Sequence, residues 1–241
     1  LASLSPMPTR SLTEDLNLST VLKKLDLFLR TSFSPEAGSL KSGKSLALLH
    51  RVEKLKYMKG ERFLVFKPRL DTRDLSLRSR FGSLSHECVF LDEQSPESIF
   101  SHLGEGVSLV AIDEVHFFGD GIVDVVKDLL RREMNVVLAG LDTDFRGEPF
   151  GSMPILLSLA DEVHKLTGIC DFPACKNPAN RTQRLVGGLP ADYRSPIIVV
   201  GDALEGYQCR CLAHHEVPHA PVRDFSAIPK LVQEKLGREF S

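Results

Sequence analysis

The residues best suited to chemistry form a glycine-rich segment near the N-terminus. Gly38-Ser39-Leu40-Lys41-Ser42-Gly43-Lys44-Ser45 satisfies the pattern G-x-x-x-x-G-K-[ST]. Glycines in this pattern let successive backbone N–H groups point at phosphate oxygens, while the lysine reaches the β- and γ-phosphates and the final hydroxyl ligates Mg²⁺. We therefore predict a nucleotide-phosphate site here, with Lys44 on the phosphates and Ser45 on the metal. A helix that begins at this point adds its positive N-terminal end.

A second candidate site is a pair of adjacent carboxylates. Asp113 and Glu114 directly follow the apolar run Val110-Ala111-Ile112. In proteins with a phosphate-binding loop, the acid that ends such a strand lies beside the loop and holds Mg²⁺, usually through water. The next acid can then accept a proton from an attacking hydroxyl. The plainer interpretation is that the two acids only end a strand, and the phosphate-binding pattern weighs against it.

Seven residues of metal-ligand type follow in the second half of the chain: Cys170, Cys175, Cys209, Cys211, His214, His215 and His219. A Cys-x4-Cys pair followed later by Cys-x2-His suits a closed tetrahedral zinc site, with Cys170, Cys175, Cys211 and His214 as ligands. Cys209 competes with Cys211, although it lies farther from His214 along the chain. Four protein ligands leave no open position, so the predicted zinc is structural. The alternative is a set of ordinary buried thiols with surface histidines.

Hydrophobic periodicity places these motifs on alternating strands and helices. Apolar runs predict strands at 25–29, 63–66, 88–91, 107–112 and 136–139, and helical spacing predicts helices at 44–58, 96–103 and 122–134. The phosphate-binding segment then opens a helix, and the two acids end a strand. Strands that alternate with helices form βαβ units, which build a mainly parallel sheet. We therefore expect an α/β fold with helices flanking the sheet.

Changes in composition and in hydrophobic spacing divide the chain into four parts. Residues 1–24 form an N-terminal extension with a short predicted helix, and residues 25–162 form the nucleotide-binding domain. Residues 163–220 hold four of the five cysteines and one predicted strand, at 196–200. We expect their apolar core to be too small for a stable fold without a bound metal. Residues 221–241 return to helical spacing as a C-terminal extension.

Composition excludes several classes of protein. Thirty Lys and Arg against 32 Asp and Glu leave a net charge of −2 over 241 residues. This balance removes the broad attraction used by general nucleic-acid and membrane-surface binding, so we expect neither partner. No apolar run approaches the ~20 residues that span a bilayer. Five cysteines fit reduced thiols or metal ligands better than a disulfide scaffold.

Taken together, the motifs resemble those of the type II thymidine kinases, the tetrameric, zinc-containing class. The resemblance covers about residues 25–218, and its stretches are 38–45, 65–74, 79–82, 112–118, 139–151, 165–170, 181–185 and Tyr207 ahead of Cys211. The block from Gly140 to Gly151 is the most specific of these.

This resemblance implies a RecA-like P-loop fold with a small zinc-bound lasso lobe. It also implies transfer of the γ-phosphoryl group of ATP to the 5′-hydroxyl of thymidine, giving thymidine monophosphate. Glu114 matches the general base, Asp113 the Mg²⁺-linked carboxylate, and the four zinc ligands match the predicted Cys and His residues. The implied thymidine site comprises Leu40, Phe117, Leu141, Phe145 and Phe150, with a lasso loop from Thr182 to Tyr207. A cytoplasmic homotetramer with feedback inhibition by thymidine triphosphate is the further expectation.

Five features depart from the family pattern: an insertion at 32–37, Leu40 for the usual Met, His116 for the usual Gln, the spacing and type of the zinc ligands, and extensions at both ends. The insertion leaves open a catalytically impaired scaffold that retains the fold, although intact Lys44, Ser45, Asp113 and Glu114 oppose this reading. A zinc-ribbon nucleic-acid binder is a third reading, and the near-neutral charge argues against it.

Overall fold

The computed structural model describes residues 25–30, 44–53, 62–70, 76–78, 85–198 and 205–221. Lys44 and Ser45 are described through their backbone. Several predicted features lie outside the described residues: the phosphate-binding segment 38–43 with Leu40, the insertion at 32–37, the N-terminal helix and the C-terminal helical extension.

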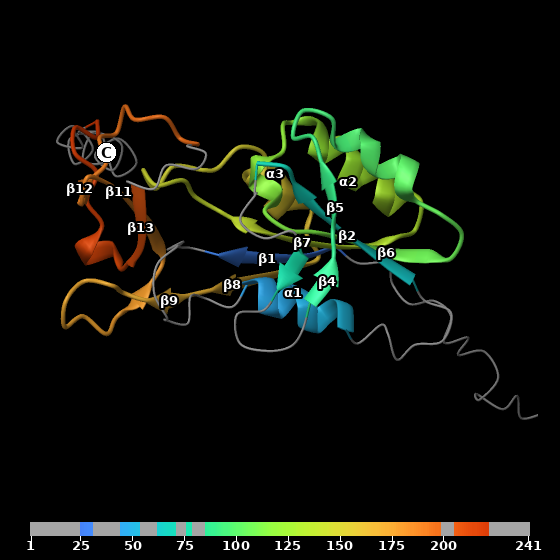
Figure 1. Ribbon diagram of the computed structural model, residues 1–241, viewed down its shortest axis with the longest axis horizontal. Helices are drawn as coiled ribbons and strands as arrows, with labels where there is room; N and C mark the ends of the chain where they lie inside the picture. The colour runs from blue at the N-terminus through green and yellow to red at the C-terminus, as the bar shows by residue number, and fades with distance from the viewer. Residues whose placement is uncertain are drawn as a thin grey trace, which may run out of the picture.

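Six parallel strands form the main sheet, in the order β5-β2-β6-β7-β1-β8. Their bounds in that order are Val89–Leu91, Arg62–Pro68, Val107–Ile112, Asn135–Leu141, Leu25–Arg30 and Glu162–Leu166. Figure 1 shows them running side by side through the middle of the molecule. The predicted α/β fold with a parallel sheet is therefore confirmed, and the carboxyl ends of its strands share one edge.

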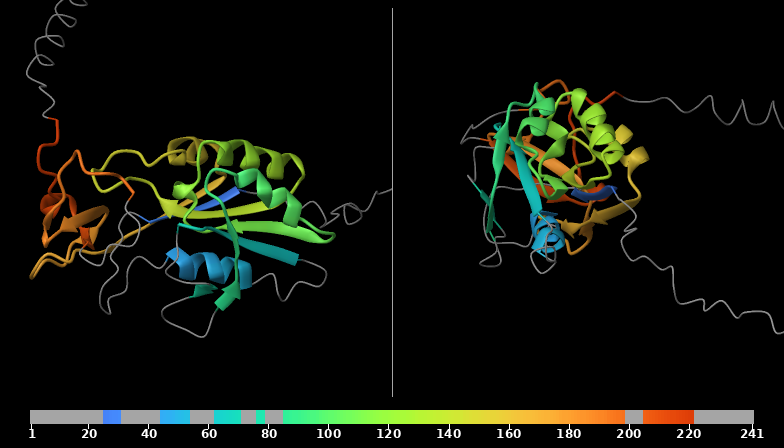
Figure 2. Two further views of the ribbon diagram at one scale, coloured as in Figure 1. Left: turned by 45° about the horizontal axis from the view of Figure 1, so that its top comes forward. Right: turned by 90° about the vertical axis from the view of Figure 1, so that its right-hand side faces the viewer.

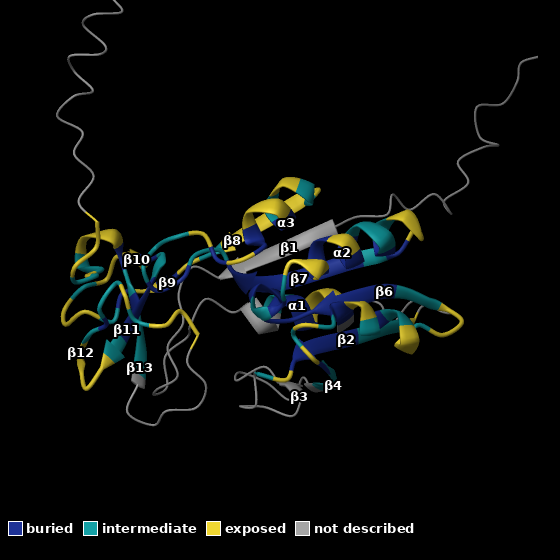
Figure 3. Cartoon of the chain, turned by 90° about the horizontal axis from the view of Figure 1, so that it is seen from above, coloured by how far each residue is buried: buried dark blue, intermediate teal, exposed yellow. Residues whose placement is uncertain are grey.

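Side chains of the central strands are buried on both faces of this sheet. In β6, Leu109 and Ala111 join one apolar cluster, whereas Val110 and Ile112 join the other. Strands buried on both faces are continuous apolar runs, which is why periodicity alone found them. Figure 3 shows β2, β6 and β7 buried over most of their length.

Helices cover both faces, as Figures 1 and 2 show. Helix α1 (Lys44–Glu53) packs Leu48, Leu49 and Val52 against one face. Helices α2 (Gly121–Arg131) and α3 (Met153–Leu159) cover the other face, together with the 3₁₀ segments η2 (Pro96–His102) and η3 (Val115–Phe117). The helix expected at 96–103 is thus a 3₁₀ helix, in which the hydroxyls of Ser98 and Ser101 donate to carbonyls three residues earlier. Among the described residues, no helix is long and apolar enough to cross a membrane.

The second lobe is built from short antiparallel strands. Strands β9 (Gly168–Ile169) and β10 (Pro178–Ala179) form one pair, and β12 (Leu189–Pro190), β11 (Arg181–Val186) and β13 (Glu205–Arg210) form a three-stranded sheet in that order. The 3₁₀ turn η4 (Leu212–His214) follows β13. A separate hairpin pairs β3 (Ser76–Arg78) with β4 (Ser85–Glu87).

One predicted strand of this lobe is wrong in part. Residues 196–198 of the strand expected at 196–200 are not in a strand, and Ile197 and Ile198 are exposed. Hydropathy missed β11 because three consecutive residues that it buries, Thr182, Gln183 and Arg184, are polar. Lobe packing therefore depends on satisfied polar groups as well as on apolar ones: the Gln183 amide donates to the carbonyl of Glu216 and accepts from its N–H.

Candidate active site and metal centre

The two predicted acids lie at the carboxyl end of β6, both buried. Asp113 is 1% exposed and Glu114 8% exposed. The backbone N–H of Asp113 donates to the carbonyl of Phe66 in the neighbouring strand, which fixes the strand end. One Asp113 carboxylate oxygen accepts the N–H of Glu114 at 3.0 Å. The orientation of this carboxylate is thus set by the backbone that carries the next acid.

Glu114 adopts an unusual backbone conformation. Its φ of 51° and ψ of 39° place it in the left-handed region, directly before η3. A residue with a Cβ in this region is strained by about 1–3 kcal/mol, and such strain concentrates at functional sites. Because η3 follows Glu114 directly, the two acids and the aromatic residues of η3 lie together at the carboxyl end of β6.

Aromatic rings gather beside this turn. The rings of Phe117 and Phe150 meet edge to face with centroids 6.0 Å apart. The imidazole of His116 packs between them, 4.2 Å from the Phe117 ring and 4.6 Å from the Phe150 ring. Leu141 ends β7 and its backbone N–H donates to Nδ1 of His116 at 3.2 Å. Three of the predicted thymidine residues are thereby brought together around one histidine.

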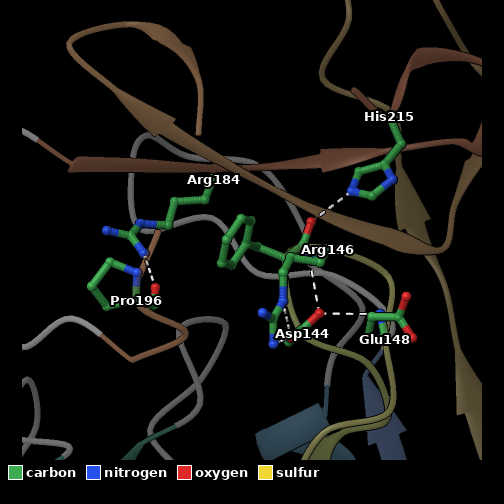
Figure 4. Close-up of polar contacts among 7 residues, drawn as sticks. Asp144, Arg146, Glu148, Arg184, Pro196 and His215 are labelled. Carbon is green, nitrogen blue, oxygen red and sulfur yellow. Dashed lines mark hydrogen bonds and ion pairs between the residues drawn. The ribbon is translucent and has the colours of Figure 1, made fainter. Parts of the chain in front are cut away.

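A tight loop after β7 carries the third predicted phenylalanine, Phe145. Buried Asp144 holds this loop: its carboxylate accepts hydrogen bonds from the N–H groups of Arg146 and Glu148 and from the guanidinium of Arg146. Figure 4 shows Asp144 between these two partners. The loop turns at Gly147, whose φ of 79° suits glycine. Phe145 itself is 3% exposed.

The same loop contacts the second lobe. His215 donates from Nε2 to the carbonyl of Phe145 at 2.9 Å (Figure 4). The guanidinium of Arg184 lies 5.4 Å from the centre of the Phe145 ring and also donates to the carbonyl of Pro196. Burial lowers the pKa of His215, against the effect of its hydrogen bond to Phe145. The neutral imidazole therefore links the lobe to the loop that carries Phe145.

Thr182 and Tyr207, the predicted ends of the lasso, lie on the paired strands β11 and β13. Thr182 is opposite Cys209 and Tyr207 is opposite Arg184. The Thr182 hydroxyl is buried, and within the described part of the chain it has no hydrogen-bond partner. The loop between these strands is described as far as residue 198.

The four predicted metal ligands converge in the second lobe. The Sγ atoms of Cys170, Cys175 and Cys211 and a ring nitrogen of His214 all lie within 4.8 Å of one another. Individual separations are 3.3 Å from Cys211 to His214, 3.6 Å from Cys170 to His214, and 4.0 Å from Cys175 to Cys211. Zinc–ligand bonds of about 2.0–2.3 Å in a tetrahedron place neighbouring ligand atoms about 3.4–3.8 Å apart. The donor set and its spacing therefore fit zinc.

Cys209, the competing candidate, lies outside this group although it is 1% exposed. Its backbone N–H donates to the carboxylate of Asp171 at 2.6 Å, and its carbonyl accepts from the N–H of Asp171. Its thiol packs with Cys170, Ala179 and Cys211 in the small core of the lobe.

The protonation of the cluster also suits a metal. Burial raises the pKa of the Cys211 thiol, but hydrogen bonds from Cys170 and from the backbone of Ala213 and His214 outweigh it and lower the pKa to about 7. At Cys175 the opposite holds: a backbone hydrogen bond from Asn177 lowers the pKa, and burial with the neighbouring thiols raises it overall. Zinc binds thiolates, so the lowered pKa of Cys211 favours zinc binding through this residue.

Comparison with known proteins now decides the family. The family model described as thymidine kinase matches residues 33–215. The chain belongs to the thymidine kinase family. A thymidine kinase of Coprothermobacter proteolyticus is 44% identical over 182 residues, which cover 75% of this chain and 88% of that protein. Among solved structures, a RuvB mutant of Thermogota maritima is 14% identical with a TM-score of 0.33, covering 62% of this chain and 40% of that chain.

Membership of the thymidine kinase family confirms the expected type II resemblance and makes the chain an enzyme. It is a phosphotransferase that uses ATP and a metal to phosphorylate thymidine. Neither the match nor the site geometry favours the impaired scaffold over this activity.

Sequence reasoning assigned no role to Asp144 or Arg184, and it placed His215 only among the residues of metal-ligand type. Asp144 lies inside the most specific block of the resemblance, and its place in that block could have pointed to it. The partners of His215 and Arg184 lie in a loop far away in the chain, so spacing gave no indication of these contacts.

Proposed function

We propose that the chain transfers the γ-phosphoryl group of ATP to the 5′-hydroxyl of thymidine, with Glu114 as the general base. The observation that carries this proposal is the turn at the end of β6, where strained Glu114 follows buried Asp113 and leads directly into the aromatic cluster. A base must lie within hydrogen-bonding reach of the hydroxyl that it deprotonates. A carboxylate next to a pocket for a nucleobase meets this requirement once the nucleoside is bound.

The proposed thymine pocket is lined by Phe117, Leu141, Phe145 and Phe150, with Leu40, Thr182 and Tyr207 completing it. A flat base is bound well between aromatic and aliphatic walls with a few polar groups to orient it. Phe117 and Phe150 form the aromatic pair, and the buried hydroxyl of Thr182 offers a polar group from the lobe. The contact from His215 to Phe145 supports a pocket completed by the lobe.

The proposed phosphate site consists of Gly38, Ser39, Leu40, Lys41, Ser42, Gly43, Lys44 and Ser45. Helix α1 begins at Lys44, which supports a phosphate-binding helix start at the point where the motif requires one. Mg²⁺ is the proposed metal, held by Ser45 and, through water, by Asp113. Held there, it would supply positive charge next to the phosphates and neutralise negative charge that develops during transfer.

We further propose a structural zinc on Cys170, Cys175, Cys211 and His214. Four ligands with no open position keep water from binding the metal, so it stabilises the lobe rather than acting on substrate. The small core around these thiols supports this role. By holding η4 in place, the site would also fix His215 next to its ligand His214.

The organisation of the whole chain belongs to the same proposal. The nucleotide-binding domain spans 25–162 and the zinc-binding lasso domain 163–220, with extensions at 1–24 and 221–241; the proposed boundary falls at β8, which pairs with β1 in the sheet. We expect a cytoplasmic homotetramer that is inhibited by thymidine triphosphate, whose nucleoside part occupies the thymidine pocket while its phosphates extend into the phosphate site. Nucleic acids and membranes are not expected partners.

Product analysis tests the proposal directly. Purified protein incubated with ATP, Mg²⁺ and thymidine should yield thymidine 5′-monophosphate and ADP in equal amounts. The matched control is Glu114→Gln, which keeps the size of the side chain but cannot accept the proton. Binding of ATP without any nucleotide product from the wild-type chain would instead establish the scaffold.

A further inference from the structure

His116 occupies a position that packing alone does not explain. Its side chain is fully buried, between the end of β6 and the end of β7. Gly140 makes room for it: a Cβ on Gly140 would lie 3.2 Å from Nδ1 of His116 and 3.1 Å from Val115. Burial of an imidazole costs free energy unless its nitrogens find partners, so an apolar side chain would serve better as simple filling.

The hydrogen bond from β7 fixes the tautomer of this ring. Because the N–H of Leu141 donates to Nδ1 at 3.2 Å, Nδ1 must carry a lone pair and the proton lies on Nε2. Nε2 faces the carboxylate of Glu114, with 3.7 Å to Oε2. This separation is longer than a hydrogen bond, and catalytic hydrogen bonds are often long in the absence of substrate and shorten once it is bound.

We propose that His116 is a positioning residue for the general base: held at Nδ1 by Leu141, it directs its Nε2–H at Glu114 and aims that carboxylate at the nucleoside hydroxyl. The inference rests on the proposed role of Glu114. In this arrangement the left-handed backbone would orient Glu114 from one end, and the Nε2–H of His116 would orient its carboxylate from the other. The arrangement also links the base to Leu141, a residue of the proposed thymine pocket.

Two substitutions separate the two contacts of the ring. An asparagine amide reaches about as far as Nδ1, so His116→Asn can keep the contact with Leu141 and loses the contact with Glu114. A glutamine amide reaches about as far as Nε2, so His116→Gln can keep a donor next to Glu114. We expect His116→Asn to lower kcat by at least about tenfold with the thymidine KM within about twofold, and His116→Gln to keep kcat within about threefold.

A double-mutant cycle with Glu114→Gln provides the decisive measurement. If His116 acts through Glu114, then His116→Asn slows phosphoryl transfer in the wild-type background and has no further effect in the Glu114→Gln background. Equal losses in both backgrounds, or full kcat in His116→Asn, would overturn the inference. A near-normal kcat in the Glu114→Gln enzyme would show instead that Glu114 is not the general base, a result distinct from the two above.

Gly140→Ala supplies a second variant that leaves His116 unchanged. The added methyl group would lie 3.2 Å from Nδ1, a tight contact that shifts the ring by a few tenths of an ångström, and it would also press on Val115 and Met153. If the position of the ring matters for Glu114, this variant should lower kcat in the wild-type background and not in the Glu114→Gln background. Thermal unfolding and zinc content, measured for every variant, identify any that has lost its fold. If the folded Gly140→Ala enzyme keeps its kcat, the inference fails independently of His116→Asn.

Discussion

At the scale of single residues, the site holds two carboxylates that are adjacent in the chain in two different ways. Asp113 is held by its own strand end and by the N–H of Glu114, whereas Glu114 turns away through a left-handed conformation. Two neighbouring acids on an extended strand would point to opposite faces. The left-handed conformation of Glu114 removes this restriction, as the proposed roles require, with Asp113 next to the metal and Glu114 next to the nucleoside.

The proposed role of Asp113 predicts that Asp113→Asn weakens the binding of Mg²⁺. The amide oxygen can still accept the N–H of Glu114, so the turn should persist, but the negative charge next to the metal is lost. We expect the apparent affinity for Mg²⁺ to fall by about 10–100-fold, as for other groups that hold a metal through water, with the thymidine KM nearly unchanged. Titration of activity with Mg²⁺ at fixed ATP measures this, and an unchanged Mg²⁺ requirement would contradict the assignment.

At the scale of elements, the sequence predicted best where burial is apolar and on both faces. Strands β6 and β7 are continuous hydrophobic runs because helices cover both sides of the sheet, so their existence, and the parallel sheet, followed from pattern alone. Strand β11 is the opposite case, since it buries three consecutive polar residues, Thr182, Gln183 and Arg184: Gln183 hydrogen-bonds to Glu216, and Arg184 lies over the ring of Phe145. Residues 196–198 look apolar enough for a strand, yet Ile197 and Ile198 are exposed.

In the candidate site too, some residues could be predicted from the sequence and others could not. Motif spacing singled out Asp113, Glu114 and the metal-ligand residues, because these chemical types are conspicuous in the chain. It could not find the contact between His116 and Leu141, which come from different strand ends and meet only once the sheet has formed. The anchoring of Phe145 by His215 likewise depends on two distant segments.

At the scale of the whole molecule, a short series of contacts links the predicted zinc ligands to the loop that carries Phe145. His214 is a predicted zinc ligand, the next residue holds the carbonyl of Phe145, and Arg184 lies over the ring of the same phenylalanine. Figure 2 shows the lobe at one end of the sheet. Loss of the metal should therefore affect the nucleoside site before it affects the sheet.

Cys175→Ser tests this connection, with Cys209→Ser as the matched control. Both remove a thiol from the same lobe, but only Cys175 belongs to the ligand cluster. We expect Cys175→Ser to lose zinc, to unfold at a lower temperature and to bind thymidine more weakly, while the KM for ATP changes little. Cys209→Ser should keep about one zinc per chain. Zinc retained in Cys175→Ser, or lost in Cys209→Ser, would show that the ligand set is wrong.

The central claim is that Glu114 takes the proton of the nucleoside hydroxyl, and single-turnover phosphoryl transfer by Glu114→Gln tests it most directly. Glutamine keeps the size of the side chain and much of its hydrogen bonding, so thymidine and ATP should still bind. We expect the rate of the chemical step to fall by roughly 10²–10⁴-fold, the usual contribution of general-base catalysis. Retention of more than about a tenth of the wild-type rate, with chemistry limiting, would contradict it.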